Sequence, residues 1–234
     1  MNNIRVVSYN IRHGRGMDQK IDLPRIAKVI LQLKPDLVAV QEVDRNCARS
    51  ENRDIIAELG TMLKLEHAFA KFMDFQEGEY GMGILSRFHI EKIISHPLPL
   101  GGEPRCALEV EIKPPFFSLP LSFICIHNDF TPDETIRVEQ INSLLKSLQE
   151  QQNPIILAGD FNAQQFDPSM IVLKNNGWHI LDKGGEKTWP SDNPKEELDF
   201  IVLRNIETTA IKHRVIDETM ASDHKPIYAA ISIG

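Results

Sequence analysis

Short runs of apolar and β-branched residues recur along the whole chain, separated by turns and by segments with helical periodicity. Runs of this length and composition are typical of buried β-strands. The pattern predicts strands over residues 5–10, 37–42, 82–86, 108–112, 121–127, 155–160, 198–203 and 227–233. This number of strands is sufficient for two β-sheets.

Helix signals lie between several of these runs. Asp22 precedes a leucine and a proline, which is typical of a capped helix with proline in its first turn. The Thr-Pro-Asp-Glu segment at 131–134 matches a capping box, so we expect a helix that is capped by the threonine and runs to about Gln151. An apolar stripe over residues 55–63 and an Asp-Pro pair at 167–168 predict two more helices.

The order of these elements indicates the fold class. Strands and helices alternate without a fixed-period repeat, a low-complexity stretch or a Gly/Ser-rich linker, so we expect residues 1–234 to form a single domain. Some strands are joined by short turns and others are separated by helices, which favours mixed sheets with helices on their outer faces. The expected fold is a layered α/β sandwich.

The composition is that of an ordinary globular protein, with 42% hydrophobic and 25% charged residues. The formal net charge of -7 disfavours a broad face for duplex nucleic acid, because phosphates and an acidic surface repel each other. No run approaches the roughly 18 apolar residues of a membrane span, and the start at Met1–Val7 lacks the apolar stretch of a signal peptide. We therefore expect a cytoplasmic protein without stable membrane insertion.

Cysteine usage points the same way. Cys47, Cys106 and Cys125 lie far apart, are odd in number and belong to no Cys-x-x-Cys pattern. Neither a disulfide framework nor a thiolate zinc site is indicated, and we expect the three thiols to be reduced.

Polar or ionisable side chains close several of the predicted strands. Asn10, Glu42, His127 and Asp160 each follow an apolar run. Any one of them has a purely structural interpretation, since polar residues favour strand ends. On aligned strands, however, they would bring two carboxylates, an amide and an imidazole to one rim of the sheets. Oxygen ligands without thiolates describe a site for a hard cation and predict Mg²⁺ or Mn²⁺.

Other polar residues extend this set. Asn162 lies two positions after Asp160 at a strand exit, where a preceding glycine lets the backbone turn, so both side chains can point the same way. Asp199 lies inside an apolar run, where an unpaired carboxylate is costly, and it therefore needs a partner. We expect that partner to be His224, which follows Asp223 near the end of the chain.

Seven segments carry these residues in order along nearly the whole chain. They are Ser8-Tyr9-Asn10-Ile11-Arg12, Gln41-Glu42-Val43, Tyr80-Gly81-Met82-Gly83-Ile84-Leu85-Ser86-Arg87, His127, Gly159-Asp160-Phe161-Asn162, Leu198-Asp199-Phe200-Ile201 and Ser222-Asp223-His224. Together they resemble the endonuclease/exonuclease/phosphatase superfamily, also called deoxyribonuclease-I-like. The resemblance implies a four-layer α-β-β-α sandwich of two mixed sheets flanked by helices, and metal-dependent hydrolysis of phosphate esters.

The resemblance also implies a metal site. Glu42 looks like the principal ligand of a divalent ion, Mg²⁺ or Mn²⁺, with Asn10 and Asp223 near the ion. Because a phosphoester substrate is anionic, the ion would offset negative charge that develops on the phosphoryl and leaving oxygens.

Five residues resemble the family's catalytic groups. By this resemblance Asp160 would orient or deprotonate the attacking water, and Asn162 would position the water or the phosphate. His127 and His224 would contact the phosphate and assist proton transfer. Asp199 beside His224 would favour the imidazolium form, which donates to the phosphate or protonates the leaving group.

The expected substrate contacts are Arg12, Tyr80 and Asn162. For Arg12, in a locally basic loop, the alternative is a solvated charged loop, and for Tyr80 it is a buried core tyrosine. Many family members carry Asn where this chain has Met82, a departure that affects a phosphate contact from that loop. Asp129 either faces the site or caps the turn before the next helix.

Some conspicuous features have a structural interpretation. Arg45, Arg49 and Arg53 lie among acidic residues, and we expect them mainly on the surface. Trp189 is expected to pack in a loop, the alternative being that it stacks on a substrate ring. The segment 113–120, rich in proline and phenylalanine, is expected to tuck under a sheet edge, the alternative being contact with lipid or a partner.

These observations predict a metal-dependent phosphoesterase, and more specifically a phosphodiesterase that acts on a small or single-stranded substrate by metal-assisted attack of water. Nucleic acid and phospholipid headgroups are the candidate substrates. Two alternatives stay open at this point: a non-catalytic protein that binds a phosphate ligand, and a nuclease that acts on DNA or RNA ends. The sequence makes no prediction of the oligomeric state.

Overall fold

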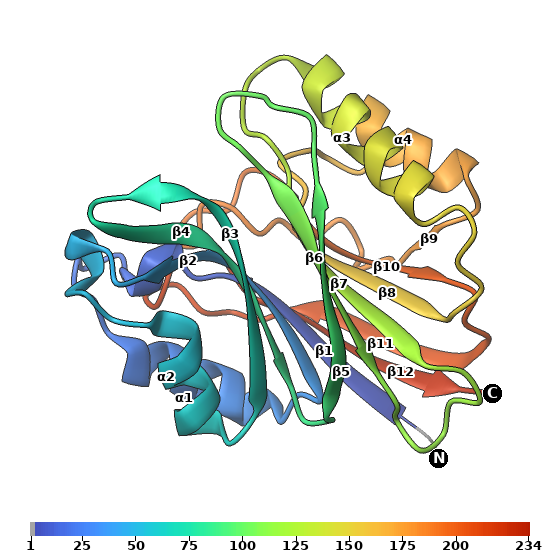
Figure 1. Cartoon of the computed structure of the whole chain (residues 1–234), viewed down its shortest axis with the longest axis horizontal. Coiled ribbons are helices and arrows are strands. Elements are labelled where there is room, and N and C mark those ends of the chain that lie inside the picture. Colours follow the sequence, from blue (N-terminus) through green and yellow to red (C-terminus); the bar gives the residue numbers. More distant parts are fainter. Residues whose placement is uncertain (1–2) are drawn as a thin grey trace.

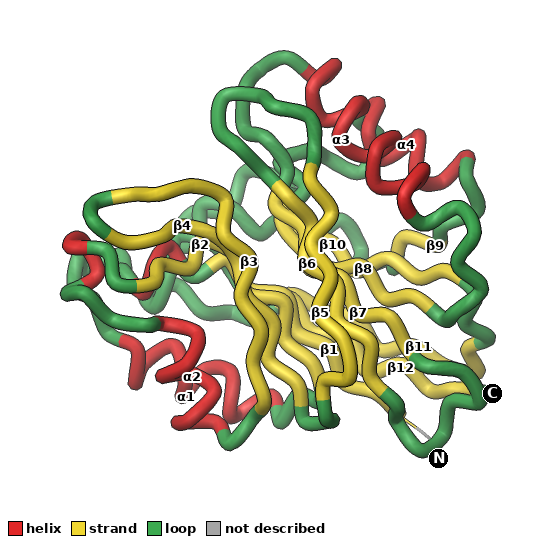
Figure 2. Tube along the Cα trace, in the orientation of Figure 1, coloured by secondary structure: helices red, strands yellow, loops and turns green. Residues whose placement is uncertain are grey.

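Two six-stranded β-sheets pack face to face in residues 3–234, the part of the chain that the computed structural model describes (Figure 1, Figure 2). The first sheet contains, in spatial order, β11 (Thr208–Val215), β12 (Ile227–Ile233), β1 (Asn3–Asn10), β2 (Leu37–Arg45), β4 (Gly78–Ser86) and β3 (Glu66–Phe75). The second contains β5 (Ile90–Pro97), β6 (Cys106–Ile112), β7 (Leu121–His127), β8 (Ile155–Asp160), β10 (Asp199–Arg204) and β9 (His179–Ile180). The first two residues of the start at Met1–Val7, for which no signal peptide is predicted, lie outside the described range.

Helices cover the outer face of each sheet (Figure 1). The pair α1 (Leu23–Leu33) and α2 (Ile55–Leu63) packs on the first sheet, and the pair α3 (Glu134–Ser147) and α4 (Pro168–Asn175) packs on the second. Two single-turn 3₁₀ helices are η1 (Arg12–Gly14) and η2 (Ala48–Ser50). The expected four-layer α-β-β-α sandwich is therefore confirmed. None of the helices in residues 3–234 has both the length and the hydropathy that crossing a bilayer requires.

Apolar cores hold the four layers together. One lies between the two sheets and includes the fully buried side chains of Val6, Met82 and Phe123. A second lies between the first sheet and its helices, and a third lies between the second sheet and its helices. Burial of each large apolar side chain contributes roughly 1.5–3 kcal/mol, so these cores dominate the stability of the sandwich. Phe116 and Phe117 pack against the inter-sheet core, as predicted for the segment that contains them.

The strands that the sequence did not indicate share one property. All of the predicted strands are present, whereas β3, β5, β9 and β11 were not indicated, and these four are the edge strands of the two sheets. An edge strand has one unpaired side and natural proteins keep it polar, which blurs its hydrophobic pattern. In β11 every residue is half-buried or exposed. Apolar runs therefore predicted the interior of each sheet but not its borders.

Helix boundaries agree with the sequence pattern except in α3. The capping box predicted at Thr131 is wrong, because Asp133 caps this helix by accepting a bond from a backbone N–H two residues later at 2.9 Å. Thr131 belongs to the preceding turn, where its N–H donates to Oδ1 of Asp129 at 2.8 Å. The helix also ends at Ser147, earlier than the predicted Gln151, because the chain turns there toward β8.

Parallel strand pairs determine where polar strand ends meet. β1 runs parallel to β2 with Asn10 opposite Gln41, and β7 runs parallel to β8 with His127 opposite Asp160. Parallel strands need a crossover connection, which is supplied by α1 in the first pair and α3 in the second, and their carboxyl ends lie at one edge. Because β1 packs on β8 and β2 packs on β7, the two edges form one rim.

Candidate active site

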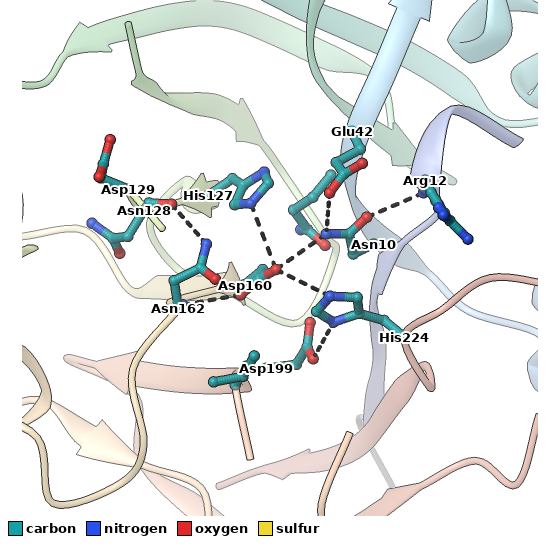
Figure 3. A network of polar contacts seen from close by, with 12 residues as sticks. Asn10, Arg12, Glu42, His127, Asn128, Asp129, Asp160, Asn162, Asp199 and His224 are labelled. Carbon is teal, nitrogen blue, oxygen red and sulfur yellow. Dashed lines mark hydrogen bonds and ion pairs between the residues drawn. The ribbon is translucent and has the colours of Figure 1, made fainter. Parts of the chain in front are cut away.

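Asp160 lies at the centre of a polar cluster at this rim (Figure 3). Its Oδ2 accepts a hydrogen bond from Nδ2 of Asn10 at 3.1 Å. The Nε2 atoms of His127 and His224 each lie 3.6 Å from the same oxygen. Burial raises the pKa of Asp160 to about 7, against the opposing charge of His224 and with a contribution from Asp199. This carboxyl group therefore exchanges its proton close to neutral pH.

A β-bulge directs Glu42 into the site. The pairing of β2 with β4 changes register between Val40 and Val43, and Glu42 has a φ of 55°. Bulges next to active sites re-aim side chains in this way. Oε1 of Glu42 accepts a hydrogen bond from Nδ2 of Asn10 at 3.0 Å, and desolvation raises the pKa of Glu42. One amide nitrogen thus joins Glu42 of the first sheet to Asp160 of the second.

Four residues at or beside the site, among others elsewhere in the described chain, have left-handed backbone conformations. Arg12, His13, Glu42 and Asn162 have φ values of 45°, 46°, 55° and 47°. Residues other than glycine adopt such angles rarely, at a cost of roughly 1–3 kcal/mol each that the surrounding packing must offset. Such strain is typical of sites where the direction of a side chain matters more than local stability.

His224 and Asp199 form the predicted pair. Nδ1 of His224 lies 3.0 Å from Oδ2 of Asp199, and both side chains are buried. The antiparallel register of β10 with β8 places Asp199 directly opposite Asp160, which brings a carboxylate from an apolar strand to the rim. Burial alone lowers the pKa of His224, but Asp199 and Asp160 outweigh it and raise the pKa to about 10. The ring is therefore an imidazolium at neutral pH.

The partner of His127 is a cation, whereas that of His224 is a carboxylate. Nη1 of Arg105 lies 3.4 Å from Nδ1 of His127. Because a guanidinium has no acceptor atom, Nδ1 must accept this bond, and the ring proton lies on Nε2, which faces Asp160. Burial, followed by the charges of Arg105 and His224, lowers the pKa of His127. This ring is therefore neutral at neutral pH.

Asn162 and Asp129 both lie near Asn128, but their hydrogen bonds differ: Asn162 bonds the site, whereas Asp129 bonds the backbone of neighbouring turns. The backbone N–H of Asn162 donates to Oδ1 of Asp160 at 2.9 Å, and its Nδ2 donates to the carbonyl of Asn128 at 2.9 Å. Asp129 accepts bonds from the backbone N–H groups of Thr131 at 2.8 Å and Gly102 at 2.7 Å. Of the two alternatives for Asp129, the structure shows the cap of a turn.

A cleft of about 580 Å³ opens over the cluster. The predicted site residues that line it are Glu42, Tyr80, His127, Asp160, Asn162, Asp223 and His224. Asn10 and Asp199 lie behind these side chains and are buried. Arg12 is placed beside the cleft as a partner of Asp223, with Nε 3.5 Å from Oδ2, and not among the lining residues.

The sequence did not indicate two arginines that line the cleft. Arg49, which we expected on the surface, forms an ion pair with the buried Asp44 at 2.8 Å and borders the cleft. A signal for it exists in Asp44, because a carboxylate that continues a buried strand needs a cation. Arg105 is 5% exposed and directly precedes β6. An isolated arginine in a loop carries no such signal.

The structure also shows the surroundings of three residues that the sequence analysis singled out: Tyr80, Met82 and Trp189. Tyr80 is buried and packs edge-on against Phe72 at 5.6 Å between ring centroids, as expected of a core tyrosine. It also lines the cleft, and its contact with substrate stays a prediction. Met82 is fully buried between the sheets and does not reach the site. Trp189 is half-buried and borders the cleft, so loop packing describes only part of its surroundings.

Comparison with protein families places these residues in a known context. A sequence model of the Endonuclease/Exonuclease/phosphatase family matches residues 7–224. The chain belongs to this family. The matched range includes every predicted site residue, from Asn10 to His224. The sequence matched no curated protein.

Solved structures of low sequence identity share the fold. A functionally unknown conserved protein from Enterococcus faecalis V583 is 20% identical, with a TM-score of 0.81 over 99% of this chain and 100% of that chain. An endonuclease/exonuclease/phosphatase from Bacteroides vulgatus is 18% identical, with a TM-score of 0.80 over 100% of both chains. Truncated TDP2 from Caenorhabditis elegans is 17% identical, with a TM-score of 0.77 over 98% of this chain and 97% of that chain.

As a member of the endonuclease/exonuclease/phosphatase family, the chain offers two groups of side chains to a divalent ion. Asp160, Asp199 and His224 have ligand atoms within 4.8 Å of one another. In this group Nδ1 of His224 already bonds Asp199. The second group is the predicted set around Glu42, which consists of oxygen donors. Mg²⁺ prefers such donors, and this second group stays a prediction.

Proposed function

We propose that this protein is a phosphodiesterase that hydrolyses a small or single-stranded substrate by attack of water, with Mg²⁺ or Mn²⁺ as cofactor. The observation that carries the proposal is the position of Asp160, whose Oδ2 lies 3.6 Å from Nε2 of both His127 and His224. Hydrolysis of a phosphoester requires a base for the water and a proton donor for the leaving oxygen. Titratable groups whose environments separate their pKa values can divide these two roles.

Asp160 is the proposed base. With a pKa of about 7, it is ionised in a large fraction of molecules at neutral pH and basic enough to accept a proton from water. Hydrogen bonds from the backbone of Asn162 and the side chain of Asn10 hold its two oxygens. An oriented carboxylate lowers the entropy that is lost when the water is positioned. The side chain of Asn162 borders the cleft, where it would position the water or the phosphate.

His224 is the proposed proton donor. Its imidazolium, maintained by Asp199, can donate from Nε2 to a phosphoryl oxygen and protonate the leaving oxygen. His127, which carries its proton on Nε2 without a charge, donates a hydrogen bond to the phosphate. The two rings would hold the phosphorus centre near Asp160.

Glu42, with Asn10 and Asp223, would hold the divalent ion. The donor set consists of two carboxylates and an amide, which suits Mg²⁺ or Mn²⁺. Desolvation raises the pKa of Glu42, and the charge of Asp223 adds to this effect, so a cation at this point would relieve excess negative charge. A bound ion supplies Lewis-acid stabilisation of the charge that develops on the phosphate.

The cleft favours a small or single-stranded substrate over a duplex. Its volume of about 580 Å³ is within the usual range for small-molecule sites. Phe75, Phe130 and Trp189 border it, and aromatic side chains can stack on bases or rings. The net charge of -7 weakens any attraction to the two phosphate backbones of a duplex.

A substrate panel tests this function. Purified protein is incubated with nucleotides, phospholipid headgroups, sugar phosphates and oligonucleotides in the presence of Mg²⁺ or Mn²⁺, and ester cleavage is scored. We expect cleavage of at least one phosphodiester, complete loss with a chelator and recovery when the ion is restored. Asp160→Asn should lower the rate about 10²–10⁴-fold, because it removes the base but keeps the shape of the side chain.

A matched variant controls for the loss of a carboxylate. Asp217→Asn removes an exposed carboxylate that pairs with Lys225 at 2.8 Å outside the cleft, and it should keep the wild-type rate. Cleavage of no panel member by the wild type with either ion would refute the proposal. A wild-type rate in Asp160→Asn would refute the role of this residue.

A further inference from the structure

Arg49 is held rigidly at one wall of the cleft. Its Nε and Nη2 donate at 2.8 Å to Oδ2 and Oδ1 of Asp44, whose side chain is fully buried. The guanidinium also lies over the rings of Phe75 and Tyr80, 4.4 and 5.1 Å from their centroids. A two-point ion pair and two aromatic rings give the guanidinium one orientation before a ligand arrives.

The third nitrogen of this guanidinium is available to a ligand. Among residues 3–234, the partners of Arg49 are bonded through its backbone, Nε or Nη2, and none is bonded through Nη1. The side chain is 27% exposed and borders the cleft. Arg105 differs, because its terminal nitrogens already face His127 and Glu103 and its side chain is buried. Arg49 is therefore the cleft arginine whose remaining donors face solvent.

Arg49 lies on the first-sheet side of the cleft, where the negative charge of Glu42 contributes to its raised pKa. It packs on Phe75, the last residue of β3, and so lies toward the β3–β4 hairpin of the first sheet. His127 and Asp160 belong to the second sheet. A phosphate that reacts beside Asp160 would therefore leave the donors of Arg49 for another group of the same molecule. Asp44 occupies Nε and Nη2, and the N–H groups of Nη1 remain as charge-assisted donors for phosphate oxygens.

We propose that Arg49 forms a second anion subsite, so that the preferred substrate carries a second phosphate group besides the one that is cleaved. This inference rests on the proposed function, since it specifies the substrate class of the same cleft. Nη1 donates to the second phosphate, while Asp44 and the two aromatic rings keep the guanidinium ordered. Because the side chain is ordered in advance, little rotamer entropy is lost on binding.

Paired synthetic substrates test the subsite. The probes are p-nitrophenyl phosphodiesters of ethanediol, butanediol and hexanediol, each with its far end either free or phosphorylated, so that the spacing of the phosphates is scanned. At one or more spacings, the terminal phosphate should raise kcat/KM of the wild type about tenfold, mainly through a lower KM, as expected for one charge-assisted contact. The measured quantity is the ratio within each pair, from which any general loss of activity cancels.

Arginine variants show whether Arg49 causes this preference. Arg49→Gln should bring the ratio to about one, and Arg49→Lys, which keeps the charge without the fork, should give an intermediate ratio. The double variant Asp44→Asn with Arg49→Gln avoids a buried unpaired carboxylate if the single variant folds poorly. Arg53→Gln is the matched control, because Arg53 also pairs with a carboxylate, Glu58, but lies outside the cleft lining.

The outcomes separate the two proposals. Equal kcat/KM within every pair in the wild type, or an unchanged preference in Arg49→Gln, would overturn the subsite and leave the hydrolase intact. If no probe is cleaved, calorimetry with butanediol bisphosphate and butanediol monophosphate tests the subsite directly. Tighter binding of the bisphosphate that is lost in Arg49→Gln supports the subsite without the hydrolase. Equal affinities overturn it.

Discussion

His127 and His224 occupy matching positions beside Asp160 and nevertheless carry different charges. Both have Nε2 at 3.6 Å from the same carboxylate oxygen, and their exposed fractions are 3% and 6%. The pKa of His127 is lowered, whereas that of His224 is raised to about 10. The difference arises at Nδ1, which faces Arg105 in the first ring and Asp199 in the second. Burial lowers the pKa of both rings, and only at His224 does a carboxylate partner reverse this effect.

Both partnerships are products of the packed sandwich and not of local sequence. His127 ends β7, and its partner Arg105 directly precedes β6. His224 lies in the loop before β12, and its partner Asp199 begins β10. Because each partner comes from a different element, one substitution can change the charge of one ring and leave the other ring in place.

The largest expected effect is the loss of the charged ring. His224→Gln should lower kcat/KM about 10²–10⁴-fold, because it removes both the proton donor and a positive charge beside the phosphate. The measurement is hydrolysis of the best panel substrate at neutral pH with Mg²⁺. His89→Gln is a matched control, because His89 pairs with Glu66 at 3.0 Å but its side chain is 80% exposed. A rate in His224→Gln within a few-fold of the wild type would exclude the proposed role.

A smaller loss is expected when the partner is neutralised and the ring is kept. Asp199→Asn should lower kcat/KM about 10²-fold and move the basic limb of the pH profile to lower pH. The sign follows from His224: its raised pKa preserves the imidazolium up to about pH 10, and loss of Asp199 lowers that limit. A pH profile of kcat/KM checks this. A basic limb at the wild-type position would show that Asp199 does not maintain the charge.

The neutral ring offers a weaker test. Arg105→Gln should lower kcat/KM about tenfold, because a glutamine amide can still donate to Nδ1 of His127 but holds the ring less firmly. Nitrogen NMR of the wild type should show the proton of His127 on Nε2. A proton found on Nδ1 in this measurement would contradict the role assigned to Arg105.

The strand interiors of the fold were predictable because burial constrains their residues. Apolar runs placed β7, β8 and β12 with their observed ends, since both faces of these strands are largely covered. The edge strands β5 and β11 escaped because half-buried and exposed residues dominate them. Solvent accepts almost any polar residue on such a strand, so the hydrophobic pattern weakens there.

Parts of the candidate site were predictable from polar residues that close apolar strands, such as His127 and Asp160, and others from side chains that could not be tolerated without a partner. Asp199 in an apolar strand required a cation, and His224 is found there. Asp44 carried a similar signal for Arg49. How strongly Asp44 indicates a cationic partner depends on the bulge at Glu42. That bulge is set by the pairing of β2 with β4 and not by local sequence. Arg105 reaches His127 only through the packing of one loop, which no short-range pattern encodes.

His213 in β11 is a third histidine, and it shows what burial does without a bonded carboxylate. Its Nδ1 lies 3.2 Å from the carbonyl of Leu181. Burial lowers the pKa of His213 to about 4, and the charge of Lys183 adds to this effect. The pKa of histidine in an unfolded chain is about 6.5. Between these values the unfolded chain binds a proton that the native protein does not, so the free energy of unfolding falls as pH is lowered.

The smallest predicted effect follows from this difference. Between pH 7 and pH 5, His213→Gln should lose less stability than the wild type, by up to about 1 kcal/mol per pH unit, because the substitution removes the titrating ring and a glutamine amide can still donate to Leu181. Urea unfolding at the two pH values measures the change, and His179→Gln, at an exposed position in β9, is the control. Equal losses in variant and wild type would mean that burial leaves the pKa of His213 unchanged. His213 would then no longer serve as the example of a ring whose pKa is lowered by burial. Without that example, the raised pKa of His224 could not be interpreted as a carboxylate overcoming the effect of burial, and the comparison of His127 with His224 would lose its basis.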